Sequence, residues 1–243
     1  MPTFDSNDGK FSFPPPEHAE EDGLLAMGGD LRVERLLAAY RTGIFPWYSD
    51  GQPILWWSPD PRLVLFPDEF HCSRSLRRTL KRGTFEIRFD TAFEEVIEAC
   101  ANAPRNYGDG TWITPGMRHA YTRLHELGFA HSVEAWRGGA LAGGLYGLSL
   151  GACFFGESMF TRETDASKAA LSALVTLCRA WNFAFIDCQV TNDHLLSLGA
   201  REIPRAAFLE QLELALRKPT REGSWRETAA TALRPPPDEA GHS

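Results

Sequence analysis

HSVEAWRGGALAGGLYGLSLGACFFGESMF, residues 131–160, decides the fold of this chain. Glycines at 138–139 and at 151 separate three largely apolar runs, and this spacing predicts three strands in an antiparallel meander. A helix is expected next over 166–181, because its apolar side chains have the i, i+4 spacing of a helix packed on a sheet. The following apolar run, 183–190, predicts a strand, so the meander should continue into a β-α-β unit.

Strands and helices also alternate between residue 63 and the meander. The pattern predicts a strand over 85–89 and a helix over 92–101. A second helix over 115–127 should begin after Thr114, which can cap its N-terminus, and end before Gly128.

The region up to residue 62 has a different composition, rich in proline and glycine. One helix is expected there over 33–41, with Asp30 as its N-cap and Gly43 beyond its end. The segment FPWYSDGQPILWWSPDPR, residues 45–62, then crowds three tryptophans among prolines. A segment this poor in periodicity folds by packing on something else.

Composition excludes several classes of protein. With 243 residues, 23% of them charged and 43% hydrophobic, the chain has the make-up of a soluble globular protein with a substantial core. No apolar run approaches the length that crosses a bilayer, and the start, MPTFDSNDGKF, lacks the basic and apolar regions of a signal peptide. We therefore expect no membrane partner and a cytoplasmic location.

Cysteine and histidine spacing gives no sign of a metal site. The five cysteines contain no CxxC pair, and the seven histidines show no HExxH or similar ligand spacing. Several cysteines lie in apolar segments, so buried free thiols are a better interpretation than disulfides or zinc ligands. The sequence predicts no metal.

A basic helix stands out against the net charge of −7, which by itself argues against a protein that coats nucleic acid. The segment HCSRSLRRTLKR, residues 71–82, carries five basic side chains, and the first four fall on one side of a helix. We call all five of these residues the basic stripe: Arg74, Arg77, Arg78, Lys81 and Arg82. Like charges this close favour a phosphate partner, and a solvated helix face is the alternative.

An acid and an amide interrupt the strand predicted at 183–190. Because side chains alternate faces along a strand, Asp187 and Gln189 should share one face with Phe185. Buried polar groups in a central strand must have hydrogen-bond partners or take part in the function of the protein. The strand alone favours a satisfied structural pair, which is the more common case.

A series of unusual strings then gives a family resemblance. The strings run in order from LLAMGGDL at Leu24 through GIFPWYS, ILWWSPDPR, GTWIT, HELGFAHSVEAWR, GGLYG, GESMF and ASKAAL to FIDCQ, NDH, SLGA and EIPR. In sequence and spacing the chain resembles the leucyl/phenylalanyl-tRNA–protein transferases. These bacterial enzymes move Leu or Phe from aminoacyl-tRNA onto proteins with an N-terminal Arg or Lys. Only about the first twenty residues and the part after Lys218 fall outside the resemblance.

The resemblance implies a fold and a set of partners. The fold class is α+β, with a small N-terminal domain, residues 1–62, packed on a mixed-sheet domain, residues 63–218, similar to the core of the GCN5-related acetyltransferases. Residues 219–243 are expected to form a disordered tail because their composition is polar and rich in proline. Aminoacyl transfer without a cofactor is expected, and the product would be marked for N-degron degradation. We also expect a monomer, since no heptad or repeat demands association.

The resemblance also assigns roles to residues. Asp187 and Gln189 match the catalytic pair; we expect Asp187 to act electrostatically or as a base and Gln189 to orient and relay. Glu157 matches a position that holds an ammonium group, with a salt bridge to Lys168 as the structural alternative. Asn192 and His194 are expected to brace the site or to cap structure.

Further matches concern the donor. Trp47 and Trp112 match positions that meet the terminal adenosine, and burial of Trp47 against the other domain is the alternative. The pocket for Leu or Phe, which should accept Met less well, is expected at Leu145, Phe154, Leu171 and Ile186, although such residues often belong only to a core. The basic stripe would contact the acceptor stem of the tRNA.

Two other functions compete with this one. A CoA-dependent N-acetyltransferase would have a similar fold and would hold the pyrophosphate with a Q/R-x-x-G-x-G/A loop that leads directly into a helix. RNYGDG, residues 105–110, has this letter pattern, but TWIT separates it from the helix expected over 115–127. A non-catalytic tRNA-binding protein would explain the basic stripe and the tryptophans, but it leaves Asp187, Gln189 and Glu157 without a role.

Overall fold

The computed structural model describes residues 3–4, 11–103 and 111–233. Its strands form a small and a large sheet. The four-stranded sheet has the order β1-β2-β4-β3, with bounds β1 (Thr3–Phe4), β2 (Leu24–Gly28), β3 (Phe45–Pro46) and β4 (Leu55–Trp57). The seven-stranded sheet has the order β11-β5-β10-β9-β8-β7-β6. Its strands are β5 (Arg62–Leu65), β6 (Glu86–Phe89), β7 (Ala130–Arg137), β8 (Ala140–Leu150), β9 (Cys153–Thr161), β10 (Phe185–Gln189) and β11 (Arg201–Ile203).

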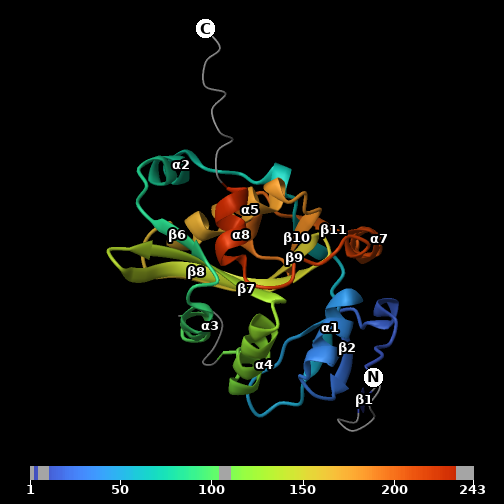
Figure 1. Cartoon of the computed structure of the whole chain (residues 1–243). Coiled ribbons are helices and arrows are strands. Elements are labelled where there is room, and N and C mark those ends of the chain that lie inside the picture. The colour runs from blue at the N-terminus through green and yellow to red at the C-terminus, as the bar shows by residue number, and fades with distance from the viewer. Residues whose placement is uncertain (1–2, 5–10, 104–110, 234–243) are drawn as a thin grey trace.

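Helices cover both faces of the large sheet. Figure 1 shows α2 (Arg74–Lys81), α5 (Ala166–Ala180) and α8 (Trp225–Ala232) above it, and α3 (Phe93–Ala101) and α4 (Pro115–Glu126) below it. The N-terminal unit, with α1 (Val33–Arg41), also lies below. The remaining helices are η1 (Pro16–His18), η2 (Pro67–Glu69), α6 (Asp193–Ser197) and α7 (Arg205–Leu216). The fold is thus mixed, with an N-terminal unit and a larger one.

The predicted centre of the fold is confirmed. Strands β7, β8 and β9 form the antiparallel meander, and α5 leads to β10, which pairs with β9 in parallel. The register between β9 and β10 runs from Cys153 and Phe185 only as far as Phe155 and Asp187. Beyond that point β9 continues beside β8 alone, so the two parallel strands separate.

The large sheet divides the apolar core into two clusters. One cluster lies with α5 and α8, and includes Phe154, Leu174 and Trp225. The other lies with α3 and α4 and continues into the N-terminal unit, where Trp56 belongs to the same cluster as Phe155. The N-terminal unit therefore shares its core with the larger unit.

Of the two predicted helix N-caps, one is confirmed and one is wrong. Thr114 caps α4 as expected, because its side chain accepts a hydrogen bond from the N–H of Met117. Asp30, however, is not the N-cap of α1; Arg32 holds that position, and the Asp30 side chain accepts a hydrogen bond from the Arg32 N–H. The helix begins at Val33, three residues after Asp30.

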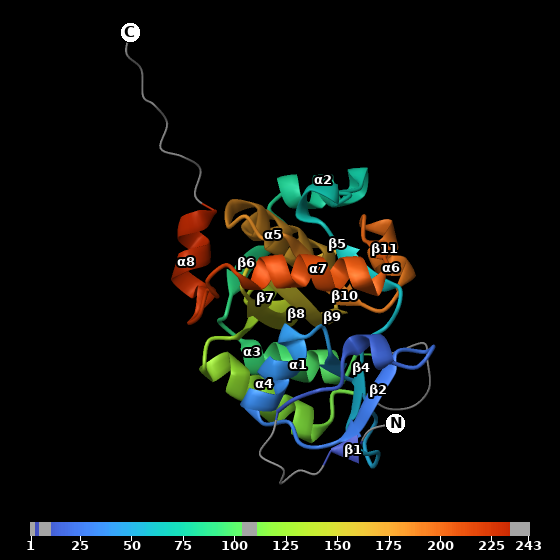
Figure 2. The same ribbon diagram turned by 90° about the vertical axis from the view of Figure 1, so that its right-hand side faces the viewer.

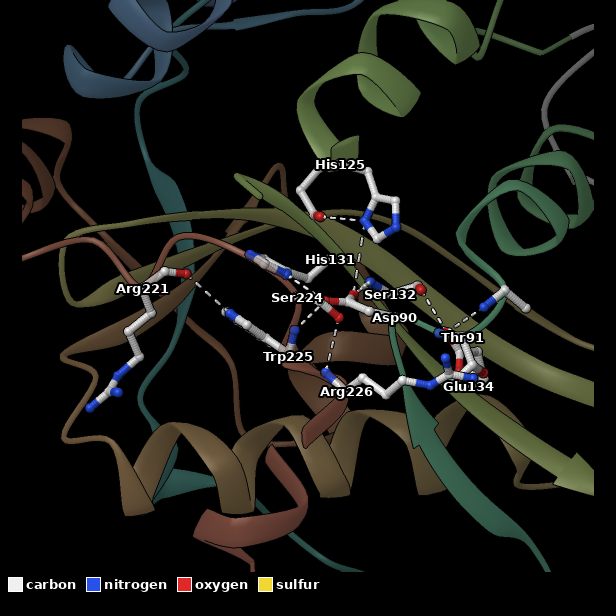
Figure 3. Close-up of polar contacts among 12 residues, drawn as sticks. Asp90, Thr91, His125, His131, Ser132, Glu134, Arg221, Ser224, Trp225 and Arg226 are labelled. Atoms are coloured by element: carbon white, nitrogen blue, oxygen red, sulfur yellow. Dashed lines mark hydrogen bonds and ion pairs between the residues drawn. The ribbon is translucent and has the colours of Figure 1, made fainter. Parts of the chain in front are cut away.

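The expected disordered tail over 219–243 is wrong for the residues described there. Residues 219–233 include the helix α8 (Trp225–Ala232), whose Trp225 is only 1% exposed. Figure 3 shows the contacts: the Trp225 N–H donates to Asp90 at 2.6 Å, and the indole stacks on His131 with ring centroids 3.8 Å apart. Composition misled here, because one buried tryptophan outweighs a run of polar neighbours. Residues 234–243 lie outside the described part of the chain.

Two other expectations concern cysteines and membranes. All five cysteines are free, with Cys100, Cys153 and Cys178 buried and Cys72 and Cys188 half-buried, in line with the thiol interpretation. Among the described residues, no helix combines the length and the apolar character needed to cross a bilayer.

Candidate active site

A cavity of about 330 Å³ lies where β9 and β10 separate. Its walls include residues of the N-terminal unit, of β9 and β10, and of α5 and α6. Most of the predicted site residues line it together: Trp47, Trp112, Leu145, Phe154, Glu157, Leu171, Ile186, Gln189, Asn192 and His194. Residues that are more than a hundred positions apart in sequence thus meet at one place.

The apolar end of the cavity contains the four expected pocket residues. Leu145, Phe154, Leu171 and Ile186 are each at most 4% exposed, and they come from β8, β9, α5 and β10. The structure adds Met159 and Leu174, which the sequence analysis did not single out. Neither carries a signal that separates it from an ordinary core residue.

The two tryptophans lie on the side of the cavity nearer the N-terminal unit. Trp47 is 42% exposed, so it is not buried against the other domain as the alternative had it. Its carbonyl accepts a hydrogen bond from the Trp57 indole at 2.7 Å, and the two rings lie 5.7 Å apart. Trp112, just before α4, is half-buried in the cavity wall.

Glu157 is the acid that lines the cavity. One carboxylate oxygen, Oε1, accepts hydrogen bonds from the Tyr40 hydroxyl at 2.7 Å and from Gln189 Nε2 at 2.9 Å. Burial raises the pKa of Glu157 to about 7, against the lowering effect of its hydrogen-bond donors, and the charge of Asp187 adds to the rise. The alternative salt bridge to Lys168 is wrong, because that ammonium lies 3.4 Å from Asp165.

Two tyrosines that the sequence analysis missed support Glu157. Tyr40 on α1 and Tyr121 on α4 are fully buried, and their hydroxyls hydrogen-bond to each other. Burial raises the pKa of both hydroxyls well above the usual range, and the charge of Glu157 adds to it. Each tyrosine lies among apolar positions of its helix, where it is indistinguishable from a core residue.

Asp187 lies behind the cavity and does not line it. It is completely buried, and Arg62 donates to both of its oxygens, from Nε at 2.8 Å and from Nη2 at 2.7 Å. Arg62 could not be predicted from the sequence, because a basic residue at the start of a strand gives no sign of a partner 125 positions away.

Gln189 reaches the cavity because β10 is irregular at its end. Its backbone φ is +64°, in the left-handed region, and the register with β5 shifts between Asp187 and Gln189. The expected simple alternation therefore fails at Gln189. The N–H of Gln189 donates to Asp187 at 2.9 Å, and its side chain turns toward Glu157.

Of the two bracing residues, Asn192 has the capping role. Its side chain accepts hydrogen bonds from the N–H groups of His194 and Leu195 at the start of α6. Burial lowers the pKa of His194, and the charge of Lys168 lowers it further, so the imidazole is neutral at pH 7.

Comparison with known proteins decides the family. Residues 64–213 match the family model described as leucyl/phenylalanyl-tRNA protein transferase, and residues 29–60 match the model of its N-terminal domain. The chain belongs to the leucyl/phenylalanyl-tRNA protein transferase family. A relative named leucyl/phenylalanyl-tRNA–protein transferase from Stutzerimonas stutzeri is 62% identical over 88% of this chain and 95% of its own length. One of the same name from Myxococcus xanthus is 59% identical over 90% of this chain and 93% of its own length.

The transferase family makes this chain an aminoacyltransferase that acts on protein N-termini, as the resemblance implied. The two competing functions are thereby excluded. Among solved structures, L-PGS from Bacillus licheniformis covers 86% of this chain and 71% of its own at 10% identity and a TM-score of 0.38. A TM-score this low carries no argument, so the likeness to GCN5-related acetyltransferases stays a prediction.

The basic stripe of the transferase lies away from the cavity, on α2, which Figure 2 shows above α5. All five side chains are exposed, and none forms an ion pair with any residue in the described ranges. Leu76 faces inward and is fully buried, so the helix is anchored by its apolar side. Its outer face is exposed to solvent.

Proposed function

We propose that the cavity holds the aminoacyl end of leucyl- or phenylalanyl-tRNA while the amine of an acceptor protein attacks the ester. The observation that carries the proposal is the composition of this one cavity. It joins an apolar end, two tryptophans and the hydrogen-bonded pair Glu157 and Gln189. Each part suits one portion of the donor: side chain, adenosine and reacting ester.

The apolar end would select the amino acid. Leu145, Phe154, Leu171 and Ile186 offer no polar partner to a charged side chain, which would be buried there without compensation. One methylene in such a pocket discriminates by only about 1–3 kcal/mol, so Met should be transferred at a reduced rate.

The two tryptophans would bind the terminal adenosine. Stacking of a base on an aromatic ring contributes roughly 1–3 kcal/mol. Trp47 is exposed enough to receive a base, and Trp112 lines the same wall. Their proposed role needs no sequence readout, in accord with an enzyme that meets the common end of all tRNAs.

The reaction needs a proton acceptor. The amine nitrogen bonds to the ester carbonyl carbon, the bond to the ribose oxygen breaks, the nitrogen loses one proton and the ribose hydroxyl gains one. An α-amino group with a reference pKa of about 7.7–8.0 is partly neutral at pH 7, so no covalent enzyme intermediate is required. Glu157, with its pKa raised to about 7, is matched to accept this proton.

Gln189 and Asp187 would assist Glu157. Since Gln189 Nε2 is committed to Glu157, its amide oxygen is the atom available to accept a hydrogen bond from the attacking amine. Asp187 has both oxygens on Arg62, so of its two expected roles the electrostatic one fits better. From behind the cavity, its negative charge would act through space on the amine as it becomes positive.

The remaining parts of the proposal follow from the family. Acceptors would carry an N-terminal Arg or Lys, the product would enter N-degron degradation, and the enzyme would act as a cytoplasmic monomer. The basic stripe would meet acceptor-stem phosphates. The domain division at residues 62–63 and the GCN5-related core belong to the same proposal; the parallel pairing of β9 and β10 supports the latter.

One assay tests the function directly. The protein is incubated with leucyl-tRNA and a peptide that begins with Arg, without CoA, and the leucylated peptide is measured by mass spectrometry. Gln189→Ala and Asp187→Asn should each lower turnover far more than they weaken donor binding. Near-normal turnover in both variants would refute the assigned site, and failure with every Arg- or Lys-initiated peptide would refute the acceptor class.

A further inference from the structure

Arg62, the first residue of β5, is a fully buried arginine beside the cavity. Three of its nitrogens have protein partners: Nε and Nη2 donate to Asp187, and Nη1 donates to the Gly43 carbonyl at 3.1 Å. Its guanidinium also lies over two rings, 4.9 Å from the centroid of Phe45 and 4.4 Å from that of Phe208. A buried cation with this many contacts is held in one geometry.

On one side, these contacts fix the catalytic strand. Two parallel N–H···O bonds from a planar guanidinium set the orientation of a carboxylate as well as its position. The same Asp187 oxygen that receives Arg62 Nε also receives the N–H of Gln189. The left-handed turn that aims Gln189 at the cavity is therefore held by a carboxylate whose own orientation Arg62 sets.

On the other side, the contacts fix the wall that carries Trp47. Phe45, whose ring lies under the guanidinium, lines the cavity, and Trp47 follows two residues later. The Gly43 carbonyl marks the start of this segment, after α1. Arg62 thus touches the chain just before the proposed adenosine wall and, 125 positions further on, the acid behind Gln189.

The geometry points to Arg62 as the positioning residue that fixes the donor-binding wall and the catalytic strand relative to each other. It acts on Gln189 through Asp187 and on Trp47 through Gly43 and Phe45. The inference rests on the proposed function of these residues. It adds that binding of the adenosine and reaction at the ester are coupled through one side chain that touches neither.

The first test is Arg62→Lys, assayed with the minimal donor leucyl-adenosine and an Arg-initiated peptide. Lysine keeps the positive charge beside Asp187 but loses the planar fork and cannot serve Asp187 and Gly43 in the same geometry. Because misplacement of reacting groups by about 1 Å can cost about 10²-fold, we expect a fall in kcat of that order. We also expect a several-fold rise in KM for leucyl-adenosine.

A matched control and a cycle separate positioning from general loss of structure. Arg35→Lys alters another fully buried arginine of the N-terminal unit, one that contacts Asp30 and does not line the cavity, and should leave kcat unchanged. In Asp187→Asn the bond from Arg62 to Gly43 survives, so kcat should fall without the rise in KM. If Arg62 acts on catalysis through Asp187, the kcat effects of Arg62→Lys and Asp187→Asn will be less than additive.

The outcomes decide the inference separately from the proposed function. Unchanged kcat and KM in Arg62→Lys, or additive effects in the cycle, overturn the inference, while low turnover in Asp187→Asn and Gln189→Ala would still support the site. If Arg62→Lys does not fold, Arg62→Met combined with Asp187→Asn removes both buried charges together. That protein should show a higher KM for leucyl-adenosine than Asp187→Asn alone, and an equal KM overturns the inference.

Discussion

The large sheet holds two clusters of buried acids that differ in what surrounds the carboxylates. The edge cluster consists of Asp90, which directly follows β6, His131 and Glu134 on β7, and Trp225 at the start of α8 (Figure 3). The cavity cluster consists of Glu157, Asp187, Gln189 and Tyr40. In both clusters the acid side chains are buried. Only the cavity cluster includes an acid that lines a cavity.

In the edge cluster, the acids receive many fixed donors. Asp90 accepts hydrogen bonds from His131 and from the backbone N–H groups of Ser132 and Trp225, while Glu134 accepts four more, two of them from backbone N–H groups. Burial alone would raise the pKa of Asp90, but its donors hold that pKa below the usual value.

In the cavity cluster, the balance is reversed at Glu157. The Tyr40 hydroxyl and the Gln189 amide donate hydrogen bonds to it, and burial outweighs the lowering effect of these donors on its pKa. The result is an acid that can gain and lose a proton near pH 7. Glu157 therefore differs from the acids of the edge cluster in two ways: it lines a cavity, and its donors do not offset the effect of burial on its pKa.

The largest expected effect compares one acid from each cluster. Glu157→Gln should lower kcat by about 10²- to 10⁴-fold, roughly 3–5 kcal/mol of barrier, because the amide cannot accept the proton. Glu134→Gln should destabilise the fold yet leave the turnover of the folded fraction intact. Single-turnover rates with leucyl-adenosine measure both. Normal rates in Glu157→Gln would contradict the proton-acceptor role.

The second effect concerns stability at the sheet edge. Trp225→Ala should lower the free energy of unfolding by about 3 kcal/mol, because it empties a packed site and leaves His131 without its stacking partner. Thermal unfolding, with activity per folded molecule measured alongside, checks this. An unchanged melting temperature would mean that α8 contributes nothing to the fold.

The third prediction uses pH to separate the clusters. The pKa of Glu157 is raised on folding, so its charge destabilises the protein at pH 8 by on the order of 3 kcal/mol, and this penalty fades as pH falls from 7 toward the unfolded value of 4.5. The pKa of Asp90 is lowered, so its contribution is present above about pH 4 and is lost as pH falls through the lowered pKa.

Denaturant unfolding at pH 8, 5.5 and 3 tests these two signs. When the pH falls from 8 to 5.5, the free energy of unfolding of the parent protein should rise because Glu157 becomes protonated. Glu157→Gln should not show this rise. Below pH 4, Asp90→Asn should lose less stability than the parent. If both variants follow the parent curve at every pH, the contrast between the clusters is wrong.

The smallest effect, per residue, lies outside both clusters, on the basic stripe. If its side chains meet phosphates, each neutralisation should flatten the salt dependence of tRNA binding by roughly 0.7–0.9 in the log–log slope. Arg77→Gln and Lys81→Gln are suitable variants. Leucyl-adenosine, which does not reach α2, should react as before. An unchanged slope with full-length tRNA would leave the stripe as a solvated helix face.

Local pattern predicted the elements well, and the resemblance predicted the residues around the cavity. Glycine turns and apolar spacing were enough for the meander and for α5, because both signals are local. The resemblance placed Trp112 and Ile186 in one site, although nothing in periodicity links them. Of the matched catalytic pair, however, Gln189 lines the cavity and Asp187 does not.

The rest depended on contacts between distant residues. Arg62 and Tyr40 acquire their meaning only from Asp187 and Glu157, which lie more than a hundred positions away in the chain. The irregular end of β10 was missed for a similar reason, since the turn at Gln189 is stabilised by a hydrogen bond and not by a glycine.

The position of α8 in the chain has a consequence for synthesis. Trp225 packs with Phe154 and Phe183 on the upper face of the sheet, and it binds Asp90 from 135 positions away. During translation, all the strands of the sheet leave the ribosome before this tryptophan does. Until it arrives, part of that apolar face stays open to water, a period in which a nascent chain is exposed to aggregation and to chaperones.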